Sequence, residues 1–493
     1  MSTTAQPNRR ETSLRETMED NVLNPVAEEQ RVSGWALLAN TAGVGTTLTM
    51  LLIGGASSYL VGVKWTLVVA AVATLFGAVI GSLTGRVSHS TGMSSTVTAR
   101  FHGLGATGSL LASLVFAVMI LSFLALENVL LYNGTLFMLG WEATTTNAIG
   151  IYLLLTVAWI VLALFGLKLV QRTSLWLTLI AGSLLLVLVG VALSESGLSL
   201  GHVLAVQPDS VTTGAVSNAL AGMIGFAGAM ALTGADFARY ARAPRDVRIM
   251  AIGGNVIVNF GVVALGAILY QAGDTVVARY LQDPAHAATA NAAPGATMTE
   301  KVQTLAHTNA GAYFVILAGL LGFAIMYAAQ VKAQAINAYA GSLALSNLFD
   351  ALFRRTPSRI VMLVLGNVIA LVCVWGGVLN VLQQLLAALG VATFSLTALM
   401  VTDFYVIRRR QPASTERIEQ VNWAGVIAGL LGFAVPYTLQ ATGIFPLGFL
   451  LTLVVTPGAY ILLRRTVLPE GTGTSTTEAT TALREVGEET ATA

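Results

Sequence analysis

Two side chains that could bind a polar ring occur in an otherwise apolar segment, at about residues 106–133. Phe123 and Glu127 are four residues apart, so in a helix they share one face. An aromatic face beside a hydrogen-bonding carboxylate would suit a planar heterocycle with ring N–H groups, because ring stacking contributes about 1–3 kcal/mol. Two other interpretations stay open: Phe123 packs against lipid or the core, and Glu127 is a structural partner of another polar group.

A second apolar segment, at about residues 311–347, carries amides and a lysine. Gln334 and Asn337 are three residues apart on one helix face, and an amide offers both a donor and an acceptor to the edge of a heterocycle. A charge in the middle of a membrane costs roughly 2.5–3.5 kcal/mol and tends to face a cavity. Lys332 is therefore predicted to be a fixed internal cation or a proton carrier. A static ion pair, for example with Glu127, is the alternative.

Glycines interrupt two further apolar segments near their middles, at residues 40–47 (NTAGVGTT) and 222–228 (GMIGFAG). The two segments are five spans apart, and that offset reverses the orientation in a membrane, as a five-plus-five inverted repeat requires. Breaks in helices free backbone groups that can bind an ion or a substrate. Gly43, Gly45 and Gly225 are therefore predicted to belong to the binding site. Close packing between helices is the alternative for all three.

The composition of the chain indicates that these segments lie in a membrane. The chain is 55% hydrophobic and 10% charged, whereas a typical soluble domain is about 25% charged. A membrane-spanning helix needs roughly 20 mostly apolar residues. About twelve segments meet this requirement, near residues 34–60, 65–86, 106–133, 147–167, 173–194, 214–237, 248–271, 311–347, 359–378, 380–406, 422–442 and 445–463.

Basic residues lie mostly on one side of this twelve-span arrangement. Of the 26 Lys and Arg residues, three lie on the opposite side (Lys64, Arg279 and Lys301), and Lys332 lies within a span. The positive-inside rule then places both termini in the cytoplasm, in a multi-pass protein of the inner (plasma) membrane. The Ala- and Thr-rich connection at about 272–310 is expected to be weakly structured, either as an outer lid or as a plain connector.

Three motifs carry a family resemblance: residues 235–240 (ADFARY), 402–408 (TDFYVIR) and 337–347 (NAYAGSLALSN). Together they resemble the nucleobase:cation symport-1 family, the group of purine–cytosine permeases and hydantoin transporters, over about residues 20–465. The resemblance implies an all-α membrane protein with a LeuT-type fold. In that fold ten core helices form two inverted repeats, and two further helices are peripheral.

The predicted organisation follows from these observations. It consists of a cytoplasmic segment at 1–32, a transport core at 33–408 with repeats at about 33–195 and 213–408, two peripheral transmembrane helices at 422–465, and a disordered cytoplasmic tail at 466–493.

The resemblance also assigns roles to residues of the site. In the family, the substrate lies among helices 1, 3, 6 and 8, between aromatic side chains from helices 3 and 6. By position, Phe123 and Glu127 resemble the aromatic and polar residues of helix 3, Phe226 the aromatic of helix 6, and Gln334 the amide of helix 8. One departure is that the usual aromatic residue of helix 3 is Trp.

A second departure concerns the coupling ion. In sodium-coupled members, hydroxyl groups of helix 8 help to bind Na+, but residues 327–329 (YAA) offer no serine or threonine. Lys332 is therefore the predicted coupling residue. Either H+ or Na+ could drive transport, with H+ favoured by this lysine.

The sequence thus predicts a secondary transporter, not an enzyme. It would import a nucleobase or related planar heterocycle of the purine, cytosine, hydantoin or allantoin type by cation-coupled alternating access. Neither a cofactor nor a structural metal is expected, and no basic patch with interleaved aromatics indicates nucleic acid. The alternatives are a proton-coupled amino-acid permease of the same fold and a non-transporting membrane sensor. The oligomeric state is left open.

Overall fold

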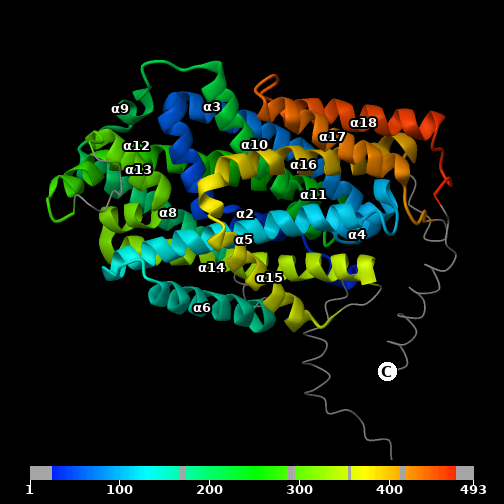
Figure 1. The fold of residues 1–493 in the computed structure, drawn as a ribbon, viewed down its shortest axis with the longest axis horizontal. Helices are drawn as coiled ribbons and strands as arrows, with labels where there is room; N and C mark the ends of the chain where they lie inside the picture. Colours follow the sequence, from blue (N-terminus) through cyan, green and yellow to red (C-terminus); the bar gives the residue numbers. More distant parts are fainter. Residues whose placement is uncertain are drawn as a thin grey trace, which may run out of the picture.

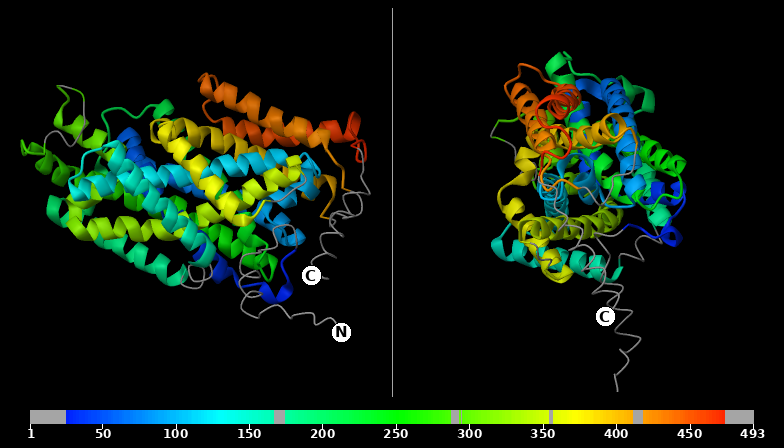
Figure 2. Two further views of the ribbon diagram at one scale, coloured as in Figure 1. Left: turned by 60° about the horizontal axis from the view of Figure 1, so that its bottom comes forward. Right: turned by 90° about the vertical axis from the view of Figure 1, so that its right-hand side faces the viewer.

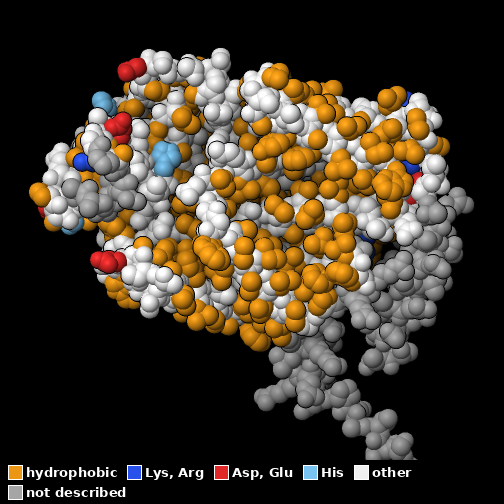
Figure 3. Space-filling model, in the orientation of Figure 1, with side chains coloured by type: hydrophobic (Ala, Val, Ile, Leu, Met, Phe, Trp, Pro, Cys, Tyr) orange, Lys and Arg blue, Asp and Glu red, His pale blue; other side chains and the backbone are white. Residues whose placement is uncertain are grey.

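The computed structural model describes residues 25–166, 174–286, 293, 295–353, 357–410 and 418–473. Within these ranges the chain forms helices and no strands, with one isolated bridge between Val32 and Ala241. The long helices run along one direction of the molecule (Figure 1). Apolar side chains cover the middle of the face shown in Figure 3, charged side chains lie toward its two ends, and histidine side chains lie at its left end. This arrangement is that of a helical bundle embedded in a membrane.

The first predicted helix is broken where glycine and threonine interrupt it. Helix α2 (Gly34–Gly45) ends at Thr46, whose hydroxyl donates to the Ala42 carbonyl at 2.8 Å. Helix α3 (Leu48–Thr91) then begins after Thr47, whose side chain caps it by accepting from Met50 N. The break predicted at residues 40–47 is therefore confirmed.

Helix α3 contains the second half of the first predicted span and the whole of the second. Its 44 residues would extend about 66 Å at 1.5 Å per residue, twice the roughly 30 Å thickness of the hydrocarbon core. The chain turns sharply at Gly62, which has φ +76° and ψ 164°. A Cβ atom there would lie 2.8 Å from the Val206 carbonyl oxygen. Glycine is therefore required at this turn for both backbone conformation and space.

The predicted break in the sixth span is wrong. Helix α10 (Thr213–Ala238) is continuous through its glycines. These glycines instead allow close contact with helix α16 (Leu382–Thr402). A Cβ atom on Gly225 would lie 2.1 Å from the Leu386 carbonyl oxygen, and one on Gly228 would lie 2.1 Å from Thr393 Oγ1. Helix packing, the alternative interpretation, accounts for this glycine pattern.

The long connection before the eighth span is more ordered than predicted. Within it, α13 (Met298–Thr308) is a helix that starts with a capping box between Thr297 and Glu300. Helix α14 (Ala310–Phe353) follows and changes direction at Ala318 and Gly319. This kink falls inside the eighth span predicted as a single helix at about 311–347, so its first turns form a separate short helix, and only the part of α14 after the kink is one long helix.

The other helices complete the bundle. They are η1 (Glu28–Gln30), α4 (Ser95–Ala99), η2 (Arg100–Leu104), α5 (Leu110–Leu139), α6 (Thr145–Val161), η3 (Leu162–Gly166), α8 (Ser174–Ser196), α9 (Leu200–Ala205), α11 (Pro244–Asn255), η4 (Val256–Val262), α12 (Val263–Gln282), α15 (Arg359–Trp375), η6 (Val378–Val381), η7 (Asp403–Ile407), α17 (Trp423–Ala441) and α18 (Gly448–Thr466).

Packing separates a core from a peripheral pair of helices. Helix α10 packs against α3 and α16, and α14 packs against α5. Helices α17 and α18 pack on each other and on α16 along one edge of the bundle (Figure 2). Ten helices in the described residues are long and apolar enough to cross a membrane, and α15 is a shorter apolar helix. The number of twelve crossings stays a prediction.

Candidate functional site

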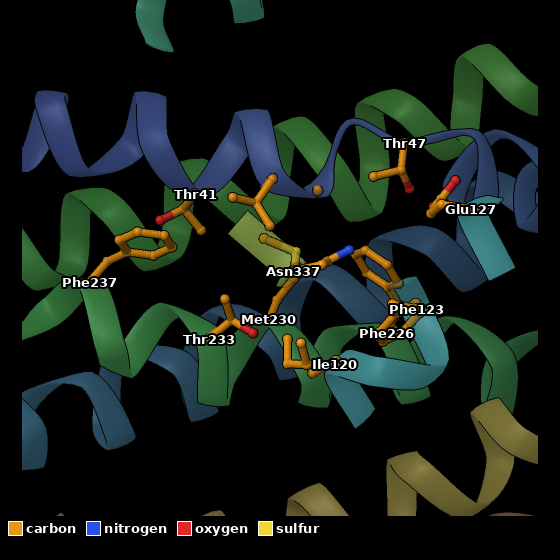
Figure 4. A pocket seen from close by; sticks show the side chains of 13 residues that line it. Thr41, Thr47, Ile120, Phe123, Glu127, Phe226, Met230, Thr233, Phe237 and Asn337 are labelled. Carbon is orange, nitrogen blue, oxygen red and sulfur yellow. The ribbon is translucent and has the colours of Figure 1, made fainter. Parts of the chain in front are cut away.

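A cavity lies beside the break between α2 and α3, where α5, α10 and α14 come together (Figure 4). Its volume is about 40 Å³, whereas an apolar cavity that takes up benzene measures about 150 Å³. The side chains and backbone that line it come from all these helices: Thr41, Val44, Gly45, Thr47, Ile120, Phe123, Glu127, Phe226, Ala229, Met230, Thr233, Phe237 and Asn337.

The two predicted aromatic residues meet at one end of this cavity. Phe123 of α5 and Phe226 of α10 are both buried, and their ring centroids are 5.3 Å apart with an interplanar angle of 76°. This is the edge-to-face arrangement that aromatic pairs prefer. A ring sandwiched between them would need parallel faces about 7 Å apart, twice the roughly 3.5 Å contact distance of carbon atoms. The aromatic pair is therefore closed on itself in this conformation.

Glu127 lies at the same end and also fixes the broken helix. Its carboxylate accepts a hydrogen bond from the Thr49 backbone N–H at 3.4 Å, in the first turn of α3, and another from the side-chain amide of Gln330. A carboxylate at a helix N-terminus is favoured by the unpaired N–H groups and by the helix dipole. The position of Glu127 is therefore compatible with both interpretations of the sequence. It lines the cavity, and it accepts a hydrogen bond from the N-terminus of α3.

Lys332 does not line the cavity but joins α14 to α2 beside it. Its Nζ donates to the Ala39 carbonyl oxygen at 2.8 Å, and the residue is 3% exposed. The ammonium occupies the space that a side chain at position 43 would need, because a Cβ atom on Gly43 would lie 2.0 Å from Nζ. The same Cβ atom would lie 2.5 Å from Thr178 Oγ1. Gly43 therefore makes room for the lysine and does not border the cavity itself.

The amide that borders the cavity is Asn337, not Gln334. Gln334 is fully buried behind it, where its Nε2 donates to the Leu124 carbonyl oxygen at 3.1 Å and to Asn128 Oδ1 at 2.8 Å. Asn337 Nδ2 donates to Gln334 Oε1 at 3.3 Å. The two amides share a helix face, as the spacing predicted, but the residue nearer the cavity is Asn337.

Of the other predicted residues, Gly45 lines the cavity and Gly225 does not. Gly225 faces α16, away from the cavity. Sequence reasoning also missed a run of α10 residues that line it together with Phe226, namely Met230, Thr233 and Phe237. These positions follow Phe226 at intervals of four, seven and eleven residues, which is one helical face. Once Phe226 is placed, that periodicity is the signal that would have found them.

A separate polar cluster joins α3, α12 and α14 beside α13, whose His307 ring centroid lies 5.7 Å from that of Tyr59. Asp274 of α12 accepts a hydrogen bond from the Tyr59 hydroxyl of α3 at 2.6 Å and another from the Tyr313 hydroxyl of α14 at 2.8 Å. Tyr313 lies before the kink of α14, directly after α13. The Asp274 carboxyl group therefore joins α3, the second half of the broken first helix, to the start of α14.

Comparison with solved structures shows the fold. The inward-facing conformation of Mhp1 matches with a TM-score of 0.67 and 16% identity, over 92% of this chain and 96% of that chain. Mhp1 in a closed conformation with bromovinylhydantoin bound, described as a nucleobase-cation-symport-1 family transporter, matches with a TM-score of 0.63 and 16% identity, over 92% and 97%. A Na+-coupled sialic acid symporter in an outward-open state matches with a TM-score of 0.58 and 13% identity, over 91% and 92%.

Comparison with family models and with curated sequences gives two further results. No curated protein sequence matches the chain. The model of the permeases for cytosine/purines, uracil, thiamine and allantoin matches residues 25–460, which is nearly the whole described part of the chain. The predicted all-α LeuT-type fold is thereby confirmed, and so is the prediction of a transporter rather than an enzyme. The chain belongs to the family of permeases for cytosine and purines, uracil, thiamine and allantoin.

Proposed function

We propose that this permease imports a planar N-heterocycle with ring N–H groups, such as a nucleobase, hydantoin or allantoin, by cation-coupled alternating access. The observation that carries the proposal is the cavity at the break between α2 and α3. Phe123 and Phe226 supply aromatic faces there, and Glu127 and Asn337 supply hydrogen-bonding groups. A flat ring with polar edges can use all four groups at once.

The broken first helix also argues against an amino acid as substrate. In transporters with discontinuous helices, the N-terminus of a half-helix can bind the carboxylate of a substrate. Here the Thr49 N–H, in the first turn of α3, is already taken by the Glu127 carboxylate. A substrate carboxylate at this place would meet a second carboxylate. A neutral heterocycle avoids that repulsion.

The closed aromatic pair supports alternating access. A cavity of about 40 Å³ admits a few water molecules but no heterocyclic ring. Substrate must therefore enter from a conformation in which the Phe123 and Phe226 rings have parted. Opening toward one side of the membrane at a time would then carry the bound ring across. Both termini and the basic loops are proposed to face the cytoplasm, as the distribution of Lys and Arg indicates.

The proposed coupling ion is H+, carried by Lys332. The ammonium reaches across from α14 to the Ala39 carbonyl oxygen of α2, and so holds the first half of the broken helix against the eighth span. Loss of the proton would remove a charge-assisted hydrogen bond and loosen this contact. A proton that crosses the membrane with the substrate contributes about 2.3 kcal/mol per 100 mV of membrane potential.

A thermal-shift screen of the purified protein tests the substrate class. Nucleobases, hydantoin and allantoin are compared with a panel of amino acids at matched concentrations. A ligand present at 100 times its Kd stabilises the folded state by about 2.7 kcal/mol. We expect stabilisation by at least one heterocycle, and a smaller stabilisation at the same concentration in Phe123→Ala. Stabilisation by amino acids alone would contradict the proposal.

Uptake into proteoliposomes tests the coupling ion. Imposed pH and Na+ gradients are compared for the wild type and for Lys332→Met, which keeps a long unbranched side chain but removes the ammonium group. We expect uptake to follow the pH gradient in the wild type and to lose that response in the variant, while ligand binding persists. Strict dependence on Na+ with no response to pH would contradict H+ coupling.

A further inference from the structure

The three motifs that carry the family resemblance meet on one short segment between α3 and α5. This segment, residues 95–104, consists of α4 and η2, and we call it the strap. From the motif at 235–240, Asp236 of α10 accepts a hydrogen bond from the Ser95 backbone N–H at 2.6 Å. From the motif at 337–347, Asn347 of α14 donates through Nδ2 to Thr96 Oγ1 at 2.7 Å. Two helices that are distant in the sequence thus hold neighbouring residues of the strap.

The motif at 402–408 binds the other end of the strap. His102 of η2 donates through Nδ1 to Asp403 Oδ2 of η7 at 3.0 Å, and both side chains are buried. The backbone of η2 is non-helical at His102, so the strap bends at this attachment. Between its two ends, Arg100 forms an ion pair with Asp350 of α14 at 3.0 Å. The strap is therefore attached to α14 and η7 as well as to α10.

The attachment to α10 lies beside the cavity. The lining face of α10 extends from Phe226 to Phe237, and Figure 4 shows these two rings at opposite ends of the cavity. Asp236, which binds the strap, directly precedes Phe237 in the chain. Helix α14 also lines the cavity, through Asn337, and contacts the strap nearer its own C-terminal end. The strap therefore joins two cavity-lining helices at the end of the cavity that Phe237 marks.

We infer that the strap is the cytoplasmic gate of this permease, and that the bond between Asp236 and Ser95 breaks when the cavity opens inward. The inference rests on the alternating access and the topology of the proposed function, in which α10 ends in the cytoplasm. While the bond holds, the end of α10 beside Phe237 stays against the strap. When it breaks, α10 moves away, and Asn347 and Asp403 keep the strap on α14 and η7.

The chemistry of this bond suits a gate. Opening the cavity toward the cytoplasm would admit water to the Asp236 carboxylate and to the Ser95 N–H. The bond between them would then be exchanged for bonds to water, and such an exchange changes the free energy only modestly. Closed and open states can therefore both be populated, as a reversible gate requires.

Position 95 allows this single donor to be removed. Ser95 is the first residue of α4, and Ser94 before it is extended, with φ −61° and ψ 161°. Proline lacks the N–H, is favoured at the first position of a helix, and requires an extended residue before it. Ser95→Pro therefore deletes the bond to Asp236 at a place where the backbone accepts proline. Ser95→Ala keeps the N–H and is the matched control.

The test is the side from which the cavity can be labelled in the full-length protein. Cys373, the one cysteine of the chain, is replaced by alanine, and Thr233→Cys in the cavity lining is the reporter. A membrane-impermeant thiol reagent is applied without substrate to right-side-out and to inside-out vesicles. The measured quantity is the ratio of the labelling rate from the cytoplasmic side to the rate from outside.

We expect Ser95→Pro to raise this ratio by about fivefold or more, the shift in an equilibrium that follows the loss of one hydrogen bond of ordinary net strength. Asp236→Ala, which removes the acceptor instead of the donor, should raise it in the same way and decides the question if Ser95→Pro fails to fold. Ser95→Ala should label like the reporter alone.

A strap that only braces the fold would give a different result. Its loss would loosen both sides alike, so an unchanged ratio in Ser95→Pro and Asp236→Ala would overturn the inference. An equal rise in Ser95→Ala would also overturn it, because that variant keeps the N–H. No substrate is present in this assay. Failure of the wild type to take up any heterocycle would therefore contradict the proposed function and leave the labelling result intact.

Discussion

Replacing Gly43 with alanine should separate α2 from the cation that holds it. The added Cβ atom would lie 2.0 Å from Lys332 Nζ and 2.7 Å from its Cε, far inside van der Waals contact. The lysine side chain is flexible and can withdraw, but the hydrogen bond to the Ala39 carbonyl oxygen, 2.8 Å long, is then lost. A hydrogen bond to a charged group contributes about 1.5–3 kcal/mol, and we expect Gly43→Ala to lose stability of that order.

The matched control is Gly190→Ala. No heavy atom lies within 4 Å of a Cβ atom at Gly190 in α8, so alanine should be neutral or stabilise the helix by up to about 1 kcal/mol. Thermal unfolding in detergent gives both stabilities, and pH-driven uptake gives coupling. Gly43→Ala should lose coupling while it keeps heterocycle binding, because Gly43 does not border the cavity.

A double-mutant cycle shows whether the lysine is the cause. In a Lys332→Met background the charged hydrogen bond is already absent, so Gly43→Ala should cost less there than in the wild type, with an interaction energy of about 1 kcal/mol or more. Equal costs in the two backgrounds would show that Gly43→Ala does not act through Lys332. So would a Gly43→Ala variant as stable and as well coupled as Gly190→Ala.

The remaining predictions concern the aromatic pair, the polar cluster at Asp274 and the topology. Phe123→Ala and Phe226→Ala should each weaken heterocycle binding by about 1–3 kcal/mol, or roughly 5- to 150-fold in Kd; calorimetry with both variants binding like the wild type would speak against this site. Tyr59→Phe should lower the free energy of unfolding by about 1–3 kcal/mol, because Asp274 loses a buried donor; an unchanged unfolding midpoint would show that the bond at 2.6 Å contributes little. A cysteine at Arg242 should react with a membrane-impermeant thiol reagent only from the cytoplasmic side, and labelling from outside would contradict the topology.

The sequence predicted the broken first helix but not the continuous sixth, although both carry the same glycine signal. At residues 40–47 two threonines follow the glycines, and the Thr46 and Thr47 side chains satisfy backbone groups at the break. At Gly225 the neighbouring surface is the backbone of α16, 2.1 Å from a Cβ atom. Glycine spacing alone does not distinguish a break from a close contact, because the partner helix is distant in the sequence.

The helix spacing brought predicted residues to the cavity where knowing the helix face was sufficient, and it did not where the depth of a side chain mattered. That these residues bind the substrate stays a prediction. The spacing of Phe123 and Glu127 placed both on the cavity. The spacing of Gln334 and Asn337 gave the right face, but it did not indicate that Gln334 donates to Asn128 of another helix while Asn337 borders the cavity. Likewise, the sequence placed an ammonium inside a span without indicating that its partner is the Ala39 carbonyl oxygen. Tertiary contacts of this kind have no local sequence signal.

Uptake of a heterocycle by the purified protein is the direct test of the proposed function. The protein is reconstituted into proteoliposomes, and uptake of radiolabelled uracil, hypoxanthine and hydantoin is followed, with Phe123→Ala proteoliposomes measured in parallel. We expect uptake of at least one compound into wild-type vesicles and a marked reduction with Phe123→Ala. Uptake that is equal in the two preparations, or absent for every heterocycle while an amino acid accumulates, would contradict it.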